Sequence, residues 1–145
     1  MRIGVDANIL LRVLLNDDLQ QSVQARDLLA SLREERRGYI GISAVLEIFW
    51  VLRSRYRVPK QTLYEMMRQL LSIRHVDVES SEAVAQALSA YRQGRAEFAD
   101  ALLAGRNVEA GCSLTYTFDR DAVKGVESMK DLGAASSLSG SGPSA

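Results

Sequence analysis

The sequence predicts an α/β fold in which a parallel sheet is covered by helices on both faces. Short stretches of β-forming residues alternate along the chain with longer stretches of helical periodicity, which indicates repeated βαβ units. Turn-forming residues separate most of these stretches, and the length of 145 residues suits one domain with a single core. The crossovers between successive strands should then be right-handed.

Runs of β-branched and aromatic residues predict four short strands, at residues 2–5, 39–42, 75–78 and 113–118. Apolar residues at helical spacing predict helices over residues 9–15, 19–32, 43–52, 59–71, 81–93 and 98–108. Turn and capping residues mark the ends of several of these helices. We expect Gly38 to close the second helix, Ser43 to cap the third, and Pro59 to occupy the first position of the fourth.

Residues 1–133 are expected to form the folded domain, because residues 134–145 are almost entirely serine, glycine and alanine. We expect this tail to be disordered. No apolar stretch approaches the roughly 18 residues of a membrane span, and the N-terminus lacks the pattern of a signal peptide. Cys112 is the only cysteine, which is typical of a protein in the reducing cytoplasm.

The net charge of the chain is zero, with 18 basic and 18 acidic residues. A neutral chain argues against a protein that coats nucleic acid non-specifically, since such proteins carry a positive surface. It does not exclude a nuclease, because a carboxylate-rich metal site offsets the charge of a basic substrate groove. All but three of the basic residues are arginines. The guanidinium group of arginine suits bidentate contacts with phosphate.

Four acidic residues interrupt apolar stretches, where an unpaired carboxylate is unfavourable. Two of them, Asp6 and Asp119, directly follow expected strands, and Glu47 and Asp100 lie near the starts of expected helices. In a parallel sheet these positions gather at the edge formed by the carboxyl ends of the strands. Four carboxylates in one place repel one another unless a cation is bound, and their hard oxygen atoms suit Mg²⁺ or Mn²⁺.

Each acid taken singly also has a structural interpretation. Asp6 and Asp119, which follow strands, could cap the next helix. Glu47 could pair with Arg53 or Arg55. Asp100 could be stabilised by the positive end of a helix dipole. The only histidine, His75, lies beside an expected strand, so neither a zinc site nor a serine–histidine pair is indicated. Taken together, the four positions indicate an acidic metal site in an α/β domain.

Four segments carry a resemblance to a known family: Val-Asp-Ala-Asn-Ile-Leu at 5–10, Ser-Ala-Val-Leu-Glu-Ile-Phe-Trp-Val-Leu at 43–52, Phe-Ala-Asp-Ala-Leu-Leu-Ala at 98–104 and Thr-Phe-Asp-Arg at 117–120. In their order and spacing the chain resembles PIN-domain ribonucleases, and among these the VapC toxins, over essentially all of residues 1–133. The resemblance implies a three-layer α/β/α fold with a central parallel sheet and metal-dependent cleavage of RNA. It implies a catalytic site formed by Asp6, Glu47, Asp100 and Asp119.

The same resemblance assigns supporting roles to three polar residues, Asn8, Ser43 and Thr117. Many relatives carry aspartate where this chain has Glu97. We therefore expect this longer acid either to support the site from outside its central set or to coordinate differently. Asp121 is a further acid nearby, which could bind a metal through water or lie solvated at the surface.

The reaction that the resemblance implies is hydrolysis of an RNA phosphodiester with one or two Mg²⁺ ions. Asp6 and Asp100 are the expected direct ligands, and Glu47 or Asp119 would orient or deprotonate the attacking water. Two cations beside this set, which could contact phosphate or form structural ion pairs, are Arg12 and Arg120.

VapC toxins typically form homodimers, and a small VapB antitoxin neutralises them by shielding the active site. The resemblance therefore implies a toxin of a type II toxin–antitoxin system, with RNA as substrate. Its protein partners would be a VapB-type antitoxin and a second copy of the chain. Phe49, Trp50 and Leu52 lie beside Glu47, and they would either pack in the core or contribute to such an interface.

Three other functions share parts of this pattern. A phosphatase with Asp6 as nucleophile usually has a second acid two residues later, where this chain has Asn8. A receiver domain should place its phosphoacceptor aspartate after a middle strand, whereas the strand at 39–42 is followed by Ser43. A non-catalytic binding module with the same fold would not need the complete set of four acids.

Overall fold

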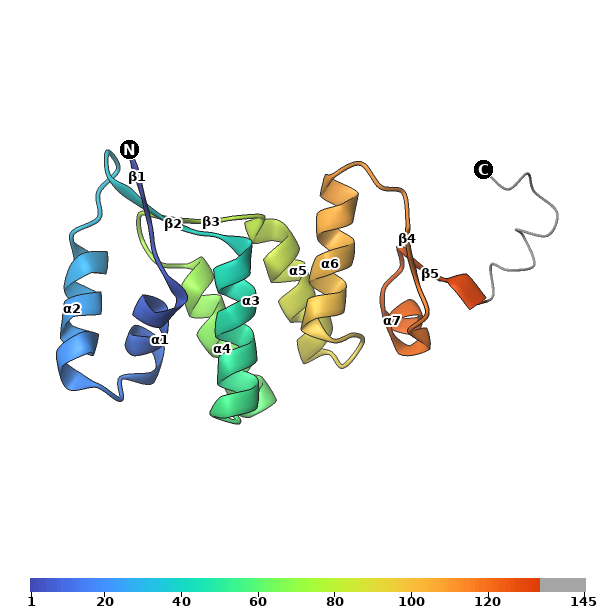
Figure 1. The fold of residues 1–145 in the computed structure, drawn as a ribbon, viewed down its shortest axis with the longest axis horizontal. Coiled ribbons are helices and arrows are strands. Elements are labelled where there is room, and N and C mark those ends of the chain that lie inside the picture. The colour runs from blue at the N-terminus through green and yellow to red at the C-terminus, as the bar shows by residue number, and fades with distance from the viewer. Residues whose placement is uncertain (134–145) are drawn as a thin grey trace. The chain divides into compact units, whose positions relative to one another are not determined.

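The computed structural model describes residues 1–133, and the predicted disordered tail at 134–145 lies outside the described residues. The chain divides into two compact units, Met1–Ser81 and a second unit that begins at Glu82. Each unit contains parallel strands with helices between them (Figure 1). The parallel pairing confirms the predicted α/β class.

The first unit contains a three-stranded parallel sheet in the order β1-β2-β3, with β1 at Arg2–Gly4, β2 at Arg37–Ile40 and β3 at Val76–Val78. Gly38 lies in β2 opposite Ile3 and Val76. A β-carbon at Gly38 would meet Leu32 Cδ1 at 2.9 Å and Val76 Cγ2 at 3.2 Å, so a larger residue would require these side chains to shift. The prediction that Gly38 closes the second helix is therefore wrong.

Five helical segments accompany this sheet: α1 (Ala7–Leu15), α2 (Leu19–Ala30), α3 (Ile42–Trp50), the π-helical turn η1 (Val51–Arg55) and α4 (Lys60–Leu71). Helix α1 packs against α2 and α3. The described core of this unit is aliphatic, and its fully buried members include Leu10, Leu32, Ile40, Ile48, Leu52 and Leu63.

Only part of the apolar periodicity of residues 19–32 faces the core: Leu32 is buried, and Leu28 and Leu29 are partly buried. Leu19 and Val23 are exposed, whereas Ser22 and Ala25 are buried. The hydroxyl of Ser22 donates to the backbone oxygen of Arg12 in α1, at 2.8 Å. The small side chains allow α2 to approach α1 closely, so packing overrides the apolar pattern at Leu19 and Val23.

The connection from α3 to α4 is irregular. Helix α3 continues into η1, whose π pattern is closed by a hydrogen bond from Tyr56 N to Val51 O at 3.2 Å. Arg57 then has a φ of 51°, in the left-handed region. Pro59 is the N-cap residue of α4, one position before the predicted one, because its carbonyl accepts the first helical hydrogen bond from Leu63.

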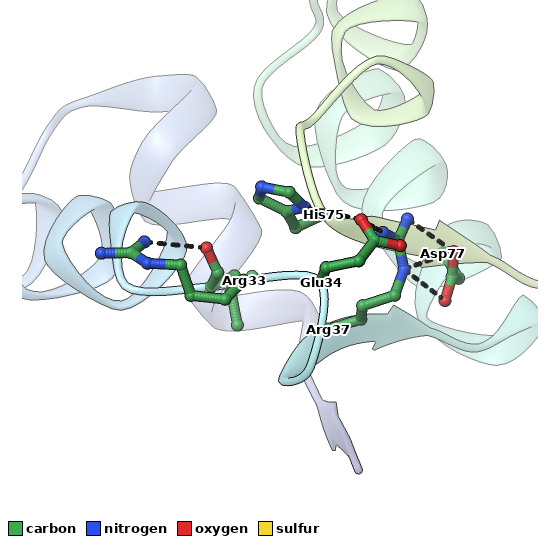
Figure 2. A network of polar contacts seen from close by, with 6 residues as sticks. Arg33, Glu34, Arg37, His75 and Asp77 are labelled. Carbon is green, nitrogen blue, oxygen red and sulfur yellow. Dashed lines mark hydrogen bonds and ion pairs between the residues drawn. The ribbon is translucent and has the colours of Figure 1, made fainter.

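The amino-terminal edge of this sheet is held by an ion-pair network (Figure 2). Arg37 at the start of β2 donates to both carboxylate oxygens of Asp77 in β3, with Nη2 to Oδ1 at 3.0 Å. Arg37 also pairs with Glu34, whose carboxylate lies 3.5 Å from His75 Nδ1. His75 has a φ of 62° and precedes β3, so it belongs to a structural network beside the strand.

The second unit contains α5 (Ser81–Arg92, which starts at the unit boundary), α6 (Phe98–Glu109), β4 (Thr115–Thr117), α7 (Arg120–Gly125) and β5 (Met129–Asp131). Strand β4 pairs in parallel with β5, in the register Thr115 opposite Met129. The predicted helix over 81–93 is confirmed as α5, and its apolar residues at helical spacing, Val84, Leu88 and Tyr91, are all buried. Gly94 and Gly111 have φ values of 73° and 97°, as turns after α5 and α6 require.

Candidate functional site

Asp6 directly follows β1, at the N-cap position of α1. The strand ladder extends as far as Val5, whose N–H donates to Tyr39 O at 2.9 Å. Asp6 itself is extended, with φ −73° and ψ 153°, and its side chain makes no capping hydrogen bond. The alternative that Asp6 serves as a helix cap is therefore not realised. Its carboxylate is exposed, as is the side chain of Asn8 in the first turn of α1.

Glu47 lies on α3, one helical turn after Ser43, and both side chains are exposed. Within the described residues no ion pair or hydrogen bond engages the Glu47 carboxylate, so the alternative of pairing with Arg53 or Arg55 is not realised. The structure thus leaves Glu47 able to contact a ligand from solvent.

Ser43 does not cap α3, and that prediction is wrong. The N-cap residue is Gly41, and the helix begins at Ile42. The Ile42 N–H instead donates to the carboxylate of Glu79, which follows β3, at 2.8 Å. Sequence reasoning missed Glu79, although it carries the signal that singled out Asp6, an acid directly after a strand.

The start of α6 carries two of the predicted acids, Glu97 and Asp100. Glu97 occupies the N-cap position, and Asp100 lies half-buried in the first turn. The pKa of Asp100 is raised above its ordinary value, first by burial and then by the negative charges of Asp119 and Glu97. The positive end of a helix ordinarily lowers the pKa of a carboxyl in the first turn, so burial and the two acidic neighbours outweigh that effect at Asp100.

Asp119 lies two residues after the end of β4 and caps α7. Its Oδ1 accepts hydrogen bonds from the backbone N–H groups of Asp121 and Ala122, at 2.9 and 3.1 Å. The hydroxyl of Thr117 accepts a bond from Asp119 N at 3.0 Å. The capping interpretation is confirmed for Asp119, and the supporting role of Thr117 in the site stays a prediction. The side chain of Asp121 is exposed.

The two predicted groove cations are both in ion pairs. Arg12 Nη1 lies 2.7 Å from Asp17 Oδ1 in the first unit. Arg120 Nε lies 3.7 Å from Asp131 Oδ2 in the second unit. The structural interpretation therefore holds for these two arginines.

Of the predicted site residues, Asp6, Asn8, Ser43 and Glu47 belong to the first unit, and Glu97, Asp100, Thr117, Asp119 and Asp121 to the second. Over residues 1–133 no group of three or more acidic, histidine or cysteine side chains has the geometry of a metal site. The donor set itself fits a hard divalent cation, because it consists of carboxylates. The only histidine is already paired with Glu34.

A hollow of about 680 Å³ in the second unit lies elsewhere. Its floor is formed by small residues of α5 and α6, including Ala83, Ala87, Ala104 and Gly105. None of the predicted site residues lines it, so it is not the candidate active site.

Comparison with known families decides the classification. The model of the PIN domain matches residues 3–126, which include every predicted site residue. The chain belongs to the PIN domain family. PIN domains are generally metal-dependent nucleases, so the chemistry of this PIN domain is that of a hydrolase of the nuclease type. A search of curated proteins gave no match.

The match also confirms the predicted three-layer α/β/α class of the PIN domain. It spans residues of both compact units. Among the described residues, no helix is long and apolar enough to cross a membrane.

Proposed function

We propose that this PIN domain is a Mg²⁺-dependent endoribonuclease and the toxin of a type II toxin–antitoxin pair. The observation that carries the catalytic part is the environment of Asp100. This carboxyl is half-buried, and its pKa is raised first by burial and then by the negative charges of Asp119 and Glu97. A divalent cation would remove the repulsion that the fold builds into this position.

Asp6 and Asp100 would hold the metal ion, which could equally be Mn²⁺. When bound, the ion would lower the pKa of a water molecule and stabilise negative charge on the phosphate. Glu47 or Asp119 would orient the water or accept its proton. The hydrogen bonds to Asp119 Oδ1 fix that carboxylate in one orientation, whereas the exposed Glu47 can adjust to the substrate.

Antitoxin binding is supported by exposed apolar residues on α2. Leu19 and Val23 lie one helical turn apart, with 76% and 54% of their surfaces exposed. A protein partner that covered this face of α2 would bury both side chains, and burial of apolar surface favours association. We propose that a VapB-type antitoxin and a second copy of the chain are the protein partners.

The nuclease proposal is tested with structured and single-stranded RNA, in Mg²⁺ and in EDTA. Wild-type protein should cleave RNA only with the metal, and Asp6→Ala and Asp100→Asn should not cleave. Asp27→Asn is the matched control, because Asp27 is an exposed acid of α2 outside the site. Cleavage that persists in EDTA or in Asp6→Ala would contradict the metal-nuclease mechanism.

The toxin proposal needs a separate experiment. Expression of the wild-type chain should stop bacterial growth, and co-expression of an antitoxin encoded beside it should restore growth. Growth arrest that is equally strong with Asp100→Asn would show that the toxicity does not come from cleavage.

A further inference from the structure

The segment that joins α3 to α4 has a surface rich in positive charge. Between Glu47 and Glu65 the chain contains no acidic residue, whereas the cations there are Arg53, Arg55, Arg57 and Lys60. All four side chains are exposed. Within residues 1–133 neither Arg55 nor Arg57 forms an ion pair, in contrast to Arg12, Arg37 and Arg120. This local excess of charge stands out in a chain whose net charge is zero.

The backbone of the same segment is irregular. The π turn Val51–Arg55 buries Val51 and Leu52 while leaving Arg53 and Arg55 at the surface. Arg57 adopts a positive φ of 51°, which a residue with a long side chain rarely does. Because π turns and strained residues concentrate at functional sites, this geometry marks the segment as more than a linker.

Two aromatic rings lie among these cations. Trp50 has 60% of its surface exposed and Tyr56 has 41%. The Tyr56 hydroxyl donates to Asp17 Oδ2 at 3.4 Å, and Asp17 is already neutralised by Arg12. Exposed rings beside arginines are the combination that holds single-stranded nucleic acid, because bases stack on the rings and guanidinium groups contact phosphates.

The surface continues from the proposed catalytic acid. Glu47, Trp50 and Arg53 follow at intervals of three residues and are all exposed, so they lie along one side of the helical segment. From Glu47 to Arg55, where the helical segment ends, the helical rise covers roughly 12 Å. A short stretch of RNA can therefore contact both positions.

We infer that the junction surface, defined by Trp50, Arg53, Arg55, Tyr56, Arg57 and Lys60, binds the single-stranded RNA that flanks the cleaved bond. The inference rests on the proposed function for the role of that RNA as substrate. Val51 and Leu52 are buried, so the surface offers cations and rings rather than aliphatic side chains. This composition favours nucleic acid over a protein partner.

The charge contribution is tested by RNA binding in EDTA, where a metal-dependent nuclease cannot cleave. The probe is a fluorescein-labelled oligouridylate of about 20 nucleotides, followed by anisotropy at several salt concentrations. The variant Arg55→Gln/Arg57→Gln should weaken binding about tenfold and reduce the slope of log K against log salt by about 1.4, since each phosphate contact contributes about 0.7. The control Arg26→Gln/Arg74→Gln removes the same charge from exposed positions elsewhere in the first unit and should leave both values unchanged.

The ring contribution has its own readout, because Trp50 is the only tryptophan in the chain. Adding the oligouridylate should quench the tryptophan fluorescence as a base stacks on the ring. By anisotropy, Trp50→Phe should retain most of the affinity, and Trp50→Ala should lose about tenfold.

Two results would overturn the inference. In the first, Arg55→Gln/Arg57→Gln binds the RNA with the same affinity and the same salt slope as the control variant Arg26→Gln/Arg74→Gln. The other is tryptophan fluorescence that ignores RNA but changes with protein concentration, which would assign the surface to a protein contact. If the protein cleaves RNA but the junction-surface variants bind RNA like the control, only the role of the junction surface is rejected. If the junction surface binds RNA but the protein does not cleave it in Mg²⁺, only the nuclease proposal is rejected.

Discussion

Asp77 and Asp100 are both partly exposed aspartates, one in each compact unit, and their surroundings are opposite. Asp77 receives three hydrogen bonds from Arg37, and its pKa is lowered, chiefly by those bonds. Asp100 has a raised pKa, caused by burial and by two neighbouring acids. The fold supplies a cation for Asp77, whereas Asp100 is partly buried and has two acidic neighbours, Asp119 and Glu97.

The difference shows how a structural acid can be distinguished from a functional one. An acid that serves the fold has its partner built in, so removing the acid costs stability. An acid that serves a ligand is left unfavourable until the ligand binds, so removing it costs activity and spares stability. The contrast between Asp77 and Asp100 therefore predicts opposite consequences for their replacement.

The largest effect is expected from Asp100→Asn. Cleavage of RNA should fall by about 100-fold or more, because a charged ligand of the proposed metal ion is lost. Stability at neutral pH should be unchanged or higher, because the neutral amide avoids the repulsion around α6. Cleavage rates and urea unfolding of the same preparations check both statements, and a strongly destabilised variant would show that Asp100 serves the fold.

Metal binding should appear as a gain in stability. At Mg²⁺ concentrations about 100 times the dissociation constant, the wild-type protein should gain about 2.7 kcal/mol, measured by urea unfolding. Asp100→Asn should gain little under the same conditions, and EDTA should reverse the wild-type gain. Equal stabilisation of both proteins would place the bound ion away from Asp100.

Asp119 both caps α7 and belongs to the proposed catalytic site, and two substitutions separate these roles. Asp119→Asn keeps an oxygen that can cap α7, so stability should change little while cleavage is lost. Asp119→Ala removes the cap as well and should cost about 1 kcal/mol of stability. If both variants retain full cleavage, the carboxylate acts only as a cap.

The smallest effect is expected at Asp77, whose ion pair is partly solvated. Asp77→Asn should lower stability slightly at neutral pH and leave cleavage unchanged. Because the pKa of Asp77 is lowered by folding, its contribution is complete above the unfolded value of about 3.9 and is lost as the pH falls through the lower folded value. Unfolding of wild type and variant between neutral and acidic pH should show the gap closing with acid. A gap that widens with acid would contradict the assignment.

Much of the architecture could be predicted from local signals. The alternation of short strands and helices, the stripe of Val84, Leu88 and Tyr91, and the turns at Gly94 and Gly111 all follow from periodicity and backbone preference. Asp18 also caps α2 as its position in the turn suggests. These features depend on residues close together in the sequence.

The features that could not be predicted depend on tertiary packing. The capping of Ile42 by Glu79 joins positions far apart in the chain. The buried face of α2 is set by the close approach of α1. Strand β5 has only three residues and buries only Met129, and the short helix α7 gives little periodicity, so both escaped prediction.

The candidate site was found through acids that interrupt apolar stretches, a local signal that works without knowledge of the fold. The same signal could not show which of these acids caps a helix and which is left for a ligand. Asp119 proved to be a cap, Asp6 did not, and the environment of Asp100 became visible only in three dimensions.

The binding of Mn²⁺ is the most direct test of the central claim that these acids hold a divalent ion. Free and bound Mn²⁺ can be measured by electron paramagnetic resonance in wild type, Asp6→Asn, Asp100→Asn and Asp77→Asn. We expect saturable binding in the wild type and in Asp77→Asn, and a large loss of affinity in the other two variants. Equal binding by all four proteins would contradict the claim.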